Sequence, residues 1–356
     1  MKAPFTQRRG RRRGQPRGIA LIAAMFVLFF LLALALAYGF AVNLEVNFAR
    51  NFMQDLQAHY CARAGIYRAL AELKIQARSG TFAYPRGDTP EEVDLLQRYE
   101  EIYRDVPLYV NDAEVGRYTV KFKDNFGQTG LGPLDETSLI NINRLAQRRD
   151  RATLERLFKE AISNEDVIRK LLDALIDYVD ADDMKLLEGA ESKEYEAVVP
   201  PIPIRNGPMR DVNEFLNVIE ALRAQYPELV DDTVWFGEDW NNNGVLDANE
   251  DDGYASPPYD NADGVLNRGI KDYVTVDSES DQVNPNTAAP EVMRIMYPEN
   301  YEQLLTDRAH TRLPGNSSVF RIRSYGKAGG YTHVIEWVVR VGGPGGYPSV
   351  IRMYSL

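Results

Sequence analysis

The sequence predicts an α+β fold in which a long N-terminal helix accompanies a small antiparallel sheet and a large inserted helical domain. Residues 19–44 contain no charged side chain, which predicts the helix. Stretches of alternating polarity, typical of half-buried strands, lie at about 108–124 and 319–354. Helical spacing dominates the block between them. Because strands flank this helical block on both sides, we expect it to be inserted into the sheet domain.

The first expected element is a helix that spans a membrane and continues beyond it. The 26 uncharged residues from Ile19 to Leu44 would form a rod of roughly 39 Å, longer than the bilayer core of about 30 Å. Apolar residues then recur three or four positions apart as far as Lys74, and no proline interrupts them. We therefore expect one helix over residues 19–74, transmembrane at 19–42. Gly65 is its weakest point, at about 1 kcal/mol relative to alanine.

Charge is distributed unevenly along the chain. The leader, residues 1–18, has seven basic side chains and no acidic one, whereas the whole chain of 356 residues has a net charge of −11. The positive-inside rule places the leader in the cytoplasm and the acidic body across the inner membrane, in the periplasm. An acidic body is a poor partner for nucleic acid, so we expect no such partner.

The start of the apolar stretch carries a processing signal. A basic leader, then Gly18, then an apolar helix beginning at Ile19 is similar to the precursors of type IV pilin-like proteins. The resemblance implies cleavage between Gly18 and Ile19 by prepilin peptidase, with the helix left in place. A secretory signal fits less well because its apolar core is about half this length. Many pilins carry Glu at the fifth mature position, which is Ala23 here.

The remaining chain is expected to complete a pilin-like fold. Residues 75–143 would begin the α/β domain, 144–306 would form the inserted helical domain, and 307–356 would add the last strands. Within the insert, residues 144–162 are expected to form one helix and 164–180 the next. The expected capping residues are Ser163 or Asn164 for the second of these helices and Thr287 for a later helix with Pro290 in its first turn.

The sequence offers no catalytic constellation. Cys61 is the single cysteine, so an intrachain disulfide is excluded. The histidines do not cluster in sequence; they are His59, His310 and His333. Four carboxylates are interpreted as a helix end with solvated charges in preference to an acid–base pair; they are Asp177, Asp180, Asp182 and Asp183. A basic run at 144–156 is interpreted as a solvated face or a partner contact.

The sharpest local motif is residues 239–250, which match the calcium-loop pattern D-x-[DN]-x-[DN]-G-x5-E at every fixed position. The expected ligands are side-chain oxygens of Asp239, Asn241 and Asn243, the carbonyl of Val245, Asp247 directly or through water, and Glu250 bidentately. Gly244 permits the bend. Three carboxylates suit a weak site, with a dissociation constant of about 10⁻⁴–10⁻³ M.

A second group of acids follows in the same segment, at Asp251, Asp252, Asp260 and Asp263. Their mutual repulsion would be relieved by a second calcium ion. A solvated acidic loop explains the same residues equally well, and the sequence leaves both interpretations open.

A series of motifs in a fixed order resembles the general secretion pathway protein K family, the large minor pseudopilins of bacterial type II secretion. The matching segments are residues 17–21, 62–70, 175–182, 189–195, 206–216 and 283–293. The family also lacks the pilin Glu, so Ala23 fits it. The resemblance implies a non-enzymatic tip subunit of a periplasmic pseudopilus with a helical domain inserted in a pilin-like fold. It would start assembly with other minor pseudopilins, packing through its N-terminal helix and pilin-like domain, and support export across the outer membrane.

Two other functions remain open from the sequence. One is a minor pilin of a type IV pilus or an adhesive tip, which the neighbouring genes would distinguish. The other is a membrane-anchored hydrolase with calcium as a structural ion, which would need a cleft with perturbed titratable groups.

Overall fold

The structure is a computed structural model that describes residues 17–79, 90–162, 164–226, 233–239, 245–253, 255, 262, 264–315, 317–342 and 347–355. The chain divides into two compact units at the boundary between Leu56 and Gln57.

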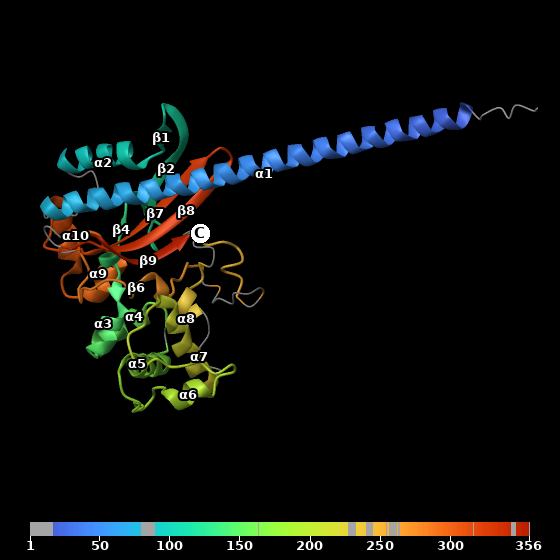
Figure 1. The fold of residues 1–356 in the computed structure, drawn as a ribbon. Helices are drawn as coiled ribbons and strands as arrows, with labels where there is room; N and C mark the ends of the chain where they lie inside the picture. Colours follow the sequence, from blue (N-terminus) through green and yellow to red (C-terminus); the bar gives the residue numbers. More distant parts are fainter. Residues whose placement is uncertain are drawn as a thin grey trace, which may run out of the picture. The chain divides into compact units, whose positions relative to one another are not determined.

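The first unit consists of apolar helix. It is part of α1 (Arg17–Ser79, Figure 1), which is longer at both ends than the predicted range of 19–74. The added C-terminal residues include no proline or glycine, so nothing in the local sequence ends the helix at Lys74. Large apolar side chains of the first unit are exposed, Phe26 by 70% and Phe40 by 75%. The most apolar 18-residue window of this helix has a mean hydropathy of 2.9, long and apolar enough by composition to cross a membrane.

The second unit is built on an antiparallel sheet with the order β1-β2-β7-β8-β9. The strands are β1 (Val106–Val110), β2 (Ala113–Lys123), β7 (Val319–Ala328), β8 (Tyr331–Arg340) and β9 (Ser349–Ser355), with the short β3 (Thr129–Leu131) on β2 and β4 (Leu134–Asp135) on β7. β2 and β7 are neighbours, with Tyr118 opposite Gly326, although almost 200 residues separate them (Figure 1). The predicted α+β fold with a helical insertion is therefore confirmed, because the helices lie between two paired strands.

The C-terminal part of α1 packs closely on this sheet. Its small residues Ala62 and Ala69 are buried in one core cluster with Tyr118 and Val120 of β2. α2 (Pro90–Tyr103) contributes aromatic side chains to the same cluster. A methyl group at Gly65 would lie 2.2 Å from Ser324 Oγ. Gly65 is thus a contact point with the sheet and more than a weak position in the helix.

The inserted block contains short helices around a second core. They are α3 (Ile142–Gln147), α4 (Arg151–Lys159), α5 (Glu165–Val179), α6 (Ser192–Glu196), α7 (Phe215–Gln225), α8 (Thr233–Phe236), α9 (Pro290–Met296) and α10 (Tyr301–His310). The same block contains three short 3-10 helices, η1 (Glu136–Ser138), η2 (Val212–Glu214) and η3 (Ile270–Asp272). It also contains two short parallel strands, β5 (Ile140–Asn141) and β6 (Val274–Thr275). The core is centred on α5, whose Leu171 is fully buried, and on Phe215 stacked against Trp235.

Two local predictions in this block are wrong. Residues 144–162 form two helices, α3 and α4, because Arg149 takes a left-handed φ of 53° and Asp150 caps the second helix. Thr287 is not a helix cap: its hydroxyl donates to Asp135 Oδ2 at 2.7 Å, and Ala289 precedes α9 instead. Pro290 does occupy the first turn of α9, as predicted.

The cap of α5 is Asn164, whose side chain accepts from the backbone N–H of Asp166 at 2.9 Å. The alternative cap, Ser163, lies outside the described residues.

A buried charge network joins the helical block to the sheet. Arg321 on β7 donates to Glu136 Oε1 at 2.5 Å and to Glu336 Oε1 at 2.8 Å. Glu136, in η1, also accepts from the hydroxyl of Thr275 in β6 at 2.7 Å. Because Glu136 is 1% exposed, its charge depends on these partners.

Candidate functional site

The N-terminal helix contains both predicted processing residues. Gly18 and Ile19 lie in the first turn of α1. Further along, in the second unit, an exposed face of α1 includes Tyr60, Tyr67 and Ile75, which are exposed by 58%, 49% and 50%. This exposed face is a candidate surface for packing against another helix.

Backbone pairing joins the segments that precede and follow the predicted calcium loop. Gly237 bridges Arg268, and the backbone N–H of Glu238 donates to Asn267 O at 2.9 Å. The Glu238 carboxylate in turn accepts from the Asn267 N–H at 2.9 Å. Gly269 allows the two segments to meet, because a methyl group there would lie 2.1 Å from the carbonyl oxygen of Trp235. Residues 239–266 therefore begin and end at one point of the insert.

The described ligands of the first predicted calcium site include two buried carboxylates. Asp239 is 2% exposed and Glu250 is 1% exposed, which is unusual for acids in a polar loop. Asp247 and Glu250 share a tight turn, in which the Asp247 N–H donates to Glu250 Oε2 at 3.2 Å. Val245 is 58% exposed. Buried acids at the first and last loop positions fit a calcium site.

Part of both predicted calcium sites lies outside the described residues. This holds for Asn241, Asn243 and Gly244 of the first site and for Asp260 and Asp263 of the second. In the described part of the second set, Asp251 and Asp252 are half-buried, and Asp251 Oδ1 accepts from the Gly264 N–H at 2.9 Å.

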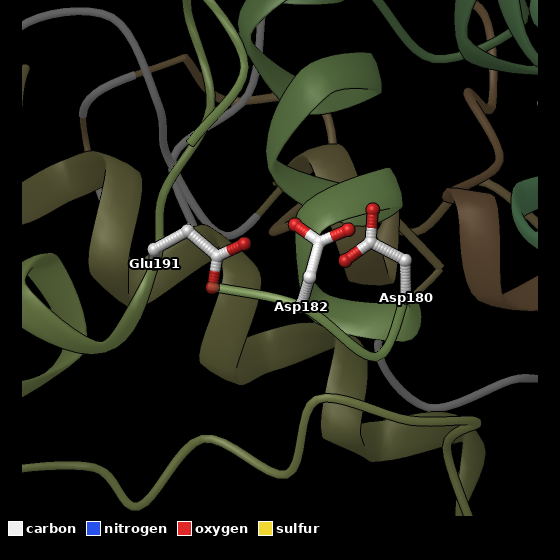
Figure 2. Close-up of side chains that lie close together, drawn as sticks. All are labelled: Asp180, Asp182 and Glu191. Carbon is white, nitrogen blue, oxygen red and sulfur yellow. The ribbon is translucent and has the colours of Figure 1, made fainter. Parts of the chain in front are cut away.

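The four carboxylates in the last turn of α5 and just after it are not all solvated. Asp177 is fully buried and accepts from the Leu186 N–H at 3.1 Å, and burial raises the pKa of its carboxyl to about 7. Asp180 and Asp182 lie with Glu191 in a cluster in which one carboxylate oxygen of each residue is within 4.8 Å of the others (Figure 2). Glu191 is not among the residues predicted for a site, although it lies within the motif segment 189–195.

The basic run of α3 and α4 is largely paired within the chain. Arg148 contacts Asp281 at 2.7 Å, and Arg151 contacts the mostly buried Asp173 at 2.5 Å. These contacts fit a solvated face, and the alternative of a partner contact stays a prediction.

Comparison with known proteins supports one family. Residues 138–231 match the model of type II secretion system (T2SS) protein K. No curated protein sequence matches the chain. A chain in the crystal structure of the GspK–GspI–GspJ complex from the enterotoxigenic Escherichia coli type 2 secretion system has 16% sequence identity and a TM-score of 0.52. The likeness covers 86% of this chain and 99% of that one.

The fold and the apolar helix define a class: a pilin-like α+β fold with a helical domain inserted between strands of its sheet, and one helix long and apolar enough to cross a membrane. The matched residues lie mostly in the inserted helices, and these set the chain apart from a pilin without such an insert. The inserted helices, within residues 138–231, are thus similar to type II secretion system protein K.

Proposed function

We propose that the chain is a minor pseudopilin at the tip of the type II secretion pseudopilus, where it starts assembly with other minor pseudopilins and supports export across the outer membrane. The observation that carries the proposal is the match to type II secretion protein K over residues 138–231, set in a pilin-like fold. The proposed role is structural and not catalytic, which is supported by the match to a component of a secretion system.

The proposed tip position is supported by the sequence at the predicted start of the mature helix. A pilin Glu at the fifth position pairs with the N-terminus of a neighbouring subunit, and Ala23 cannot do so. A subunit at the tip has no neighbour above it with which a Glu at this position could pair. Cleavage after Gly18 would leave the helix in the inner membrane before assembly, with the acidic body in the periplasm.

The partners would be other minor pseudopilins. The solved relative is part of a complex with GspI and GspJ. In this chain, the exposed side chains of α1 at Tyr60, Tyr67 and Ile75 offer apolar area for a neighbouring helix.

Calcium is the proposed structural ion of the insert. The side chains of Asp239, Asn241, Asn243, Asp247 and Glu250 would hold it together with the carbonyl of Val245. The acids Asp251, Asp252, Asp260 and Asp263 would either hold a second ion or form a solvated acidic loop. A bound divalent ion supplies charge neutralisation and cross-links the loop. Binding to the folded state would raise the melting temperature in millimolar calcium, and Asp239→Ala would reduce that rise.

A deletion strain tests the function. Removal of the gene should stop secretion of type II substrates into the medium, and the wild-type gene should restore it. The matched variant Gly18→Leu should fail to restore secretion and should retain its leader by mass spectrometry. Normal secretion in the deletion strain, with loss of surface pili, would support the minor pilin alternative instead.

A further inference from the structure

A small pocket opens in the second unit between the C-terminal part of α1, α2 and the β2–β3 pair. Its volume is about 110 Å³. An apolar cavity of about 150 Å³ holds a benzene molecule, so this pocket suits a slightly smaller organic group. Exposed side chains mark its mouth, among them Leu96 on α2 and Thr129 on β3. Deeper in the pocket the lining side chains are buried, and they include Leu73, Tyr99, Phe122, Asp135, Ser317 and Phe320.

Asp135 is the only charged side chain among the described residues that line this pocket, and it is 1% exposed. Its carboxylate accepts hydrogen bonds from four neutral groups: the Thr137 N–H at 2.9 Å, the Thr287 hydroxyl at 2.7 Å, the Asn284 amide at 3.2 Å and the Ser317 hydroxyl. In the described part of the chain, no lysine, arginine or histidine forms an ion pair with it. The charge of this buried acid is therefore not compensated by a cation of the described residues.

The hydrogen bonds of Asp135 leave room for another donor. Three of the four reach Oδ2, whereas among the described residues Oδ1 accepts only from Thr137. Each carboxylate oxygen can accept about two hydrogen bonds, so Oδ1 keeps an acceptor position. Burial raises the pKa of Asp135, although its hydrogen bonds act in the opposite direction. A cation beside this carboxylate would favour the ionised form and offset the cost of burying it.

The lining of the pocket selects the kind of cation. A hard metal ion needs six or more oxygen ligands, and a wall made largely of apolar side chains does not provide them. A primary ammonium group instead has three N–H donors and one positive charge. Asp135 Oδ1 can accept one of these donors, and the hydroxyls of Thr287 and Ser317, which also line the pocket, keep lone pairs for the others. An alkyl stem behind the ammonium group would contact the apolar walls.

We propose that this pocket binds a primary alkylammonium group, with the ammonium head at Asp135 and the alkyl stem against Leu73, Phe122 and Phe320. Two sources carry this chemistry. One is a free alkylamine, and the other is the side chain of a lysine in another protein, which has the same head on a stem of four carbons. In both cases the ligand joins the end of α1 to the sheet and to the start of the inserted block, because the pocket is lined by all three.

Saturation-transfer NMR of the full-length chain in detergent, titrated with butylammonium chloride, tests this site. The matched variants are Asp135→Asn and Asp150→Asn, because Asp150 also caps a helix, accepts from the Thr153 N–H and does not line the pocket. We expect saturable binding to the wild type and to Asp150→Asn, and binding at least about tenfold weaker to Asp135→Asn. The uncharged 1-butanol should bind the wild type at least about tenfold more weakly than butylammonium. Equal binding by the two variants, or of the two ligands, overturns the proposal.

Leu96→Trp keeps the test decisive if Asp135→Asn does not fold. Leu96 is 38% exposed, so a larger ring there covers the mouth of the pocket and leaves Asp135 unchanged. We expect this variant to lose most of the butylammonium binding, and binding equal to that of the wild type overturns the proposal.

The dipeptide-like compound Nα-acetyl-lysine methylamide distinguishes the two sources of the ammonium group. Binding to the wild type as tight as that of butylammonium supports a lysine side chain from another protein. Binding of butylammonium alone supports a free amine, because the mouth then excludes a peptide backbone. Binding of neither compound overturns the site.

Discussion

The contact between α1 and the sheet makes a quantitative prediction for Gly326→Ala. A methyl group at Gly326 would lie 2.0 Å from the carbonyl oxygen of Ala58, 2.2 Å from Ala62 N and 2.9 Å from Ala62 Cα. All three atoms belong to the helix backbone, so rotation of a side chain cannot relieve the overlap. The helix must move away from β7, which opens the core around Ile66 and Tyr118.

The magnitude follows from two opposing effects. Overpacking of a tight core costs about 1–3 kcal/mol, and the upper end applies because backbone atoms are involved. Replacing glycine by alanine also stabilises the folded state by about 0.5–1 kcal/mol, because alanine lowers the conformational entropy of the unfolded chain. The net loss in unfolding free energy is therefore about 2 kcal/mol, or roughly 4–8 °C in melting temperature at about 2–4 °C per kcal/mol.

The assay is thermal and urea unfolding of the full chain in detergent, followed by tryptophan fluorescence. Gly330→Ala is the matched control, since it lies in the turn that follows β7 and has no atom within 4 Å of an added methyl group. We expect the control to stay within about 0.5 kcal/mol of the wild type. Equal stability of Gly326→Ala and Gly330→Ala would refute the close contact.

Three further substitutions test the second unit. Glu136→Gln should lower the unfolding free energy by about 2–3 kcal/mol, because it weakens the partner of the half-buried Arg321; the exposed Glu114→Gln should cost less than about 1 kcal/mol in the same urea titration. Asn141→Ala should cost about 1–2 kcal/mol by calorimetry, through loss of the α3 cap; an unchanged melting temperature would contradict that role. Burial raises the pKa of Tyr99 to about 12 from 10.0, so above pH 10 the unfolded chain releases a proton that the folded chain keeps. Stability should fall as pH rises through that window, by up to about 2–3 kcal/mol, and Tyr99→Phe should flatten this part of the stability curve.

The sequence by itself determined the features that depend on neighbouring residues. The uncharged run after Gly18 predicts the apolar helix because a span depends on length and composition. Alternation predicts β2 and β7 because side chains alternate between the faces of a strand. The motif at 239–250 is local in the same way, and calcium binding there stays a prediction.

The tertiary structure decided what depends on contacts between distant segments. The antiparallel pairing of β2 with β7, the contact of Gly326 with α1 and the approach of Glu191 to Asp180 all join residues that no periodicity relates. The break at Arg149 shows the same limit within a helical pattern, because a left-handed residue leaves the apolar spacing unchanged. Hydrophobic periodicity specifies which face of an element is buried, but the partner that covers the face is chosen by packing of the whole domain.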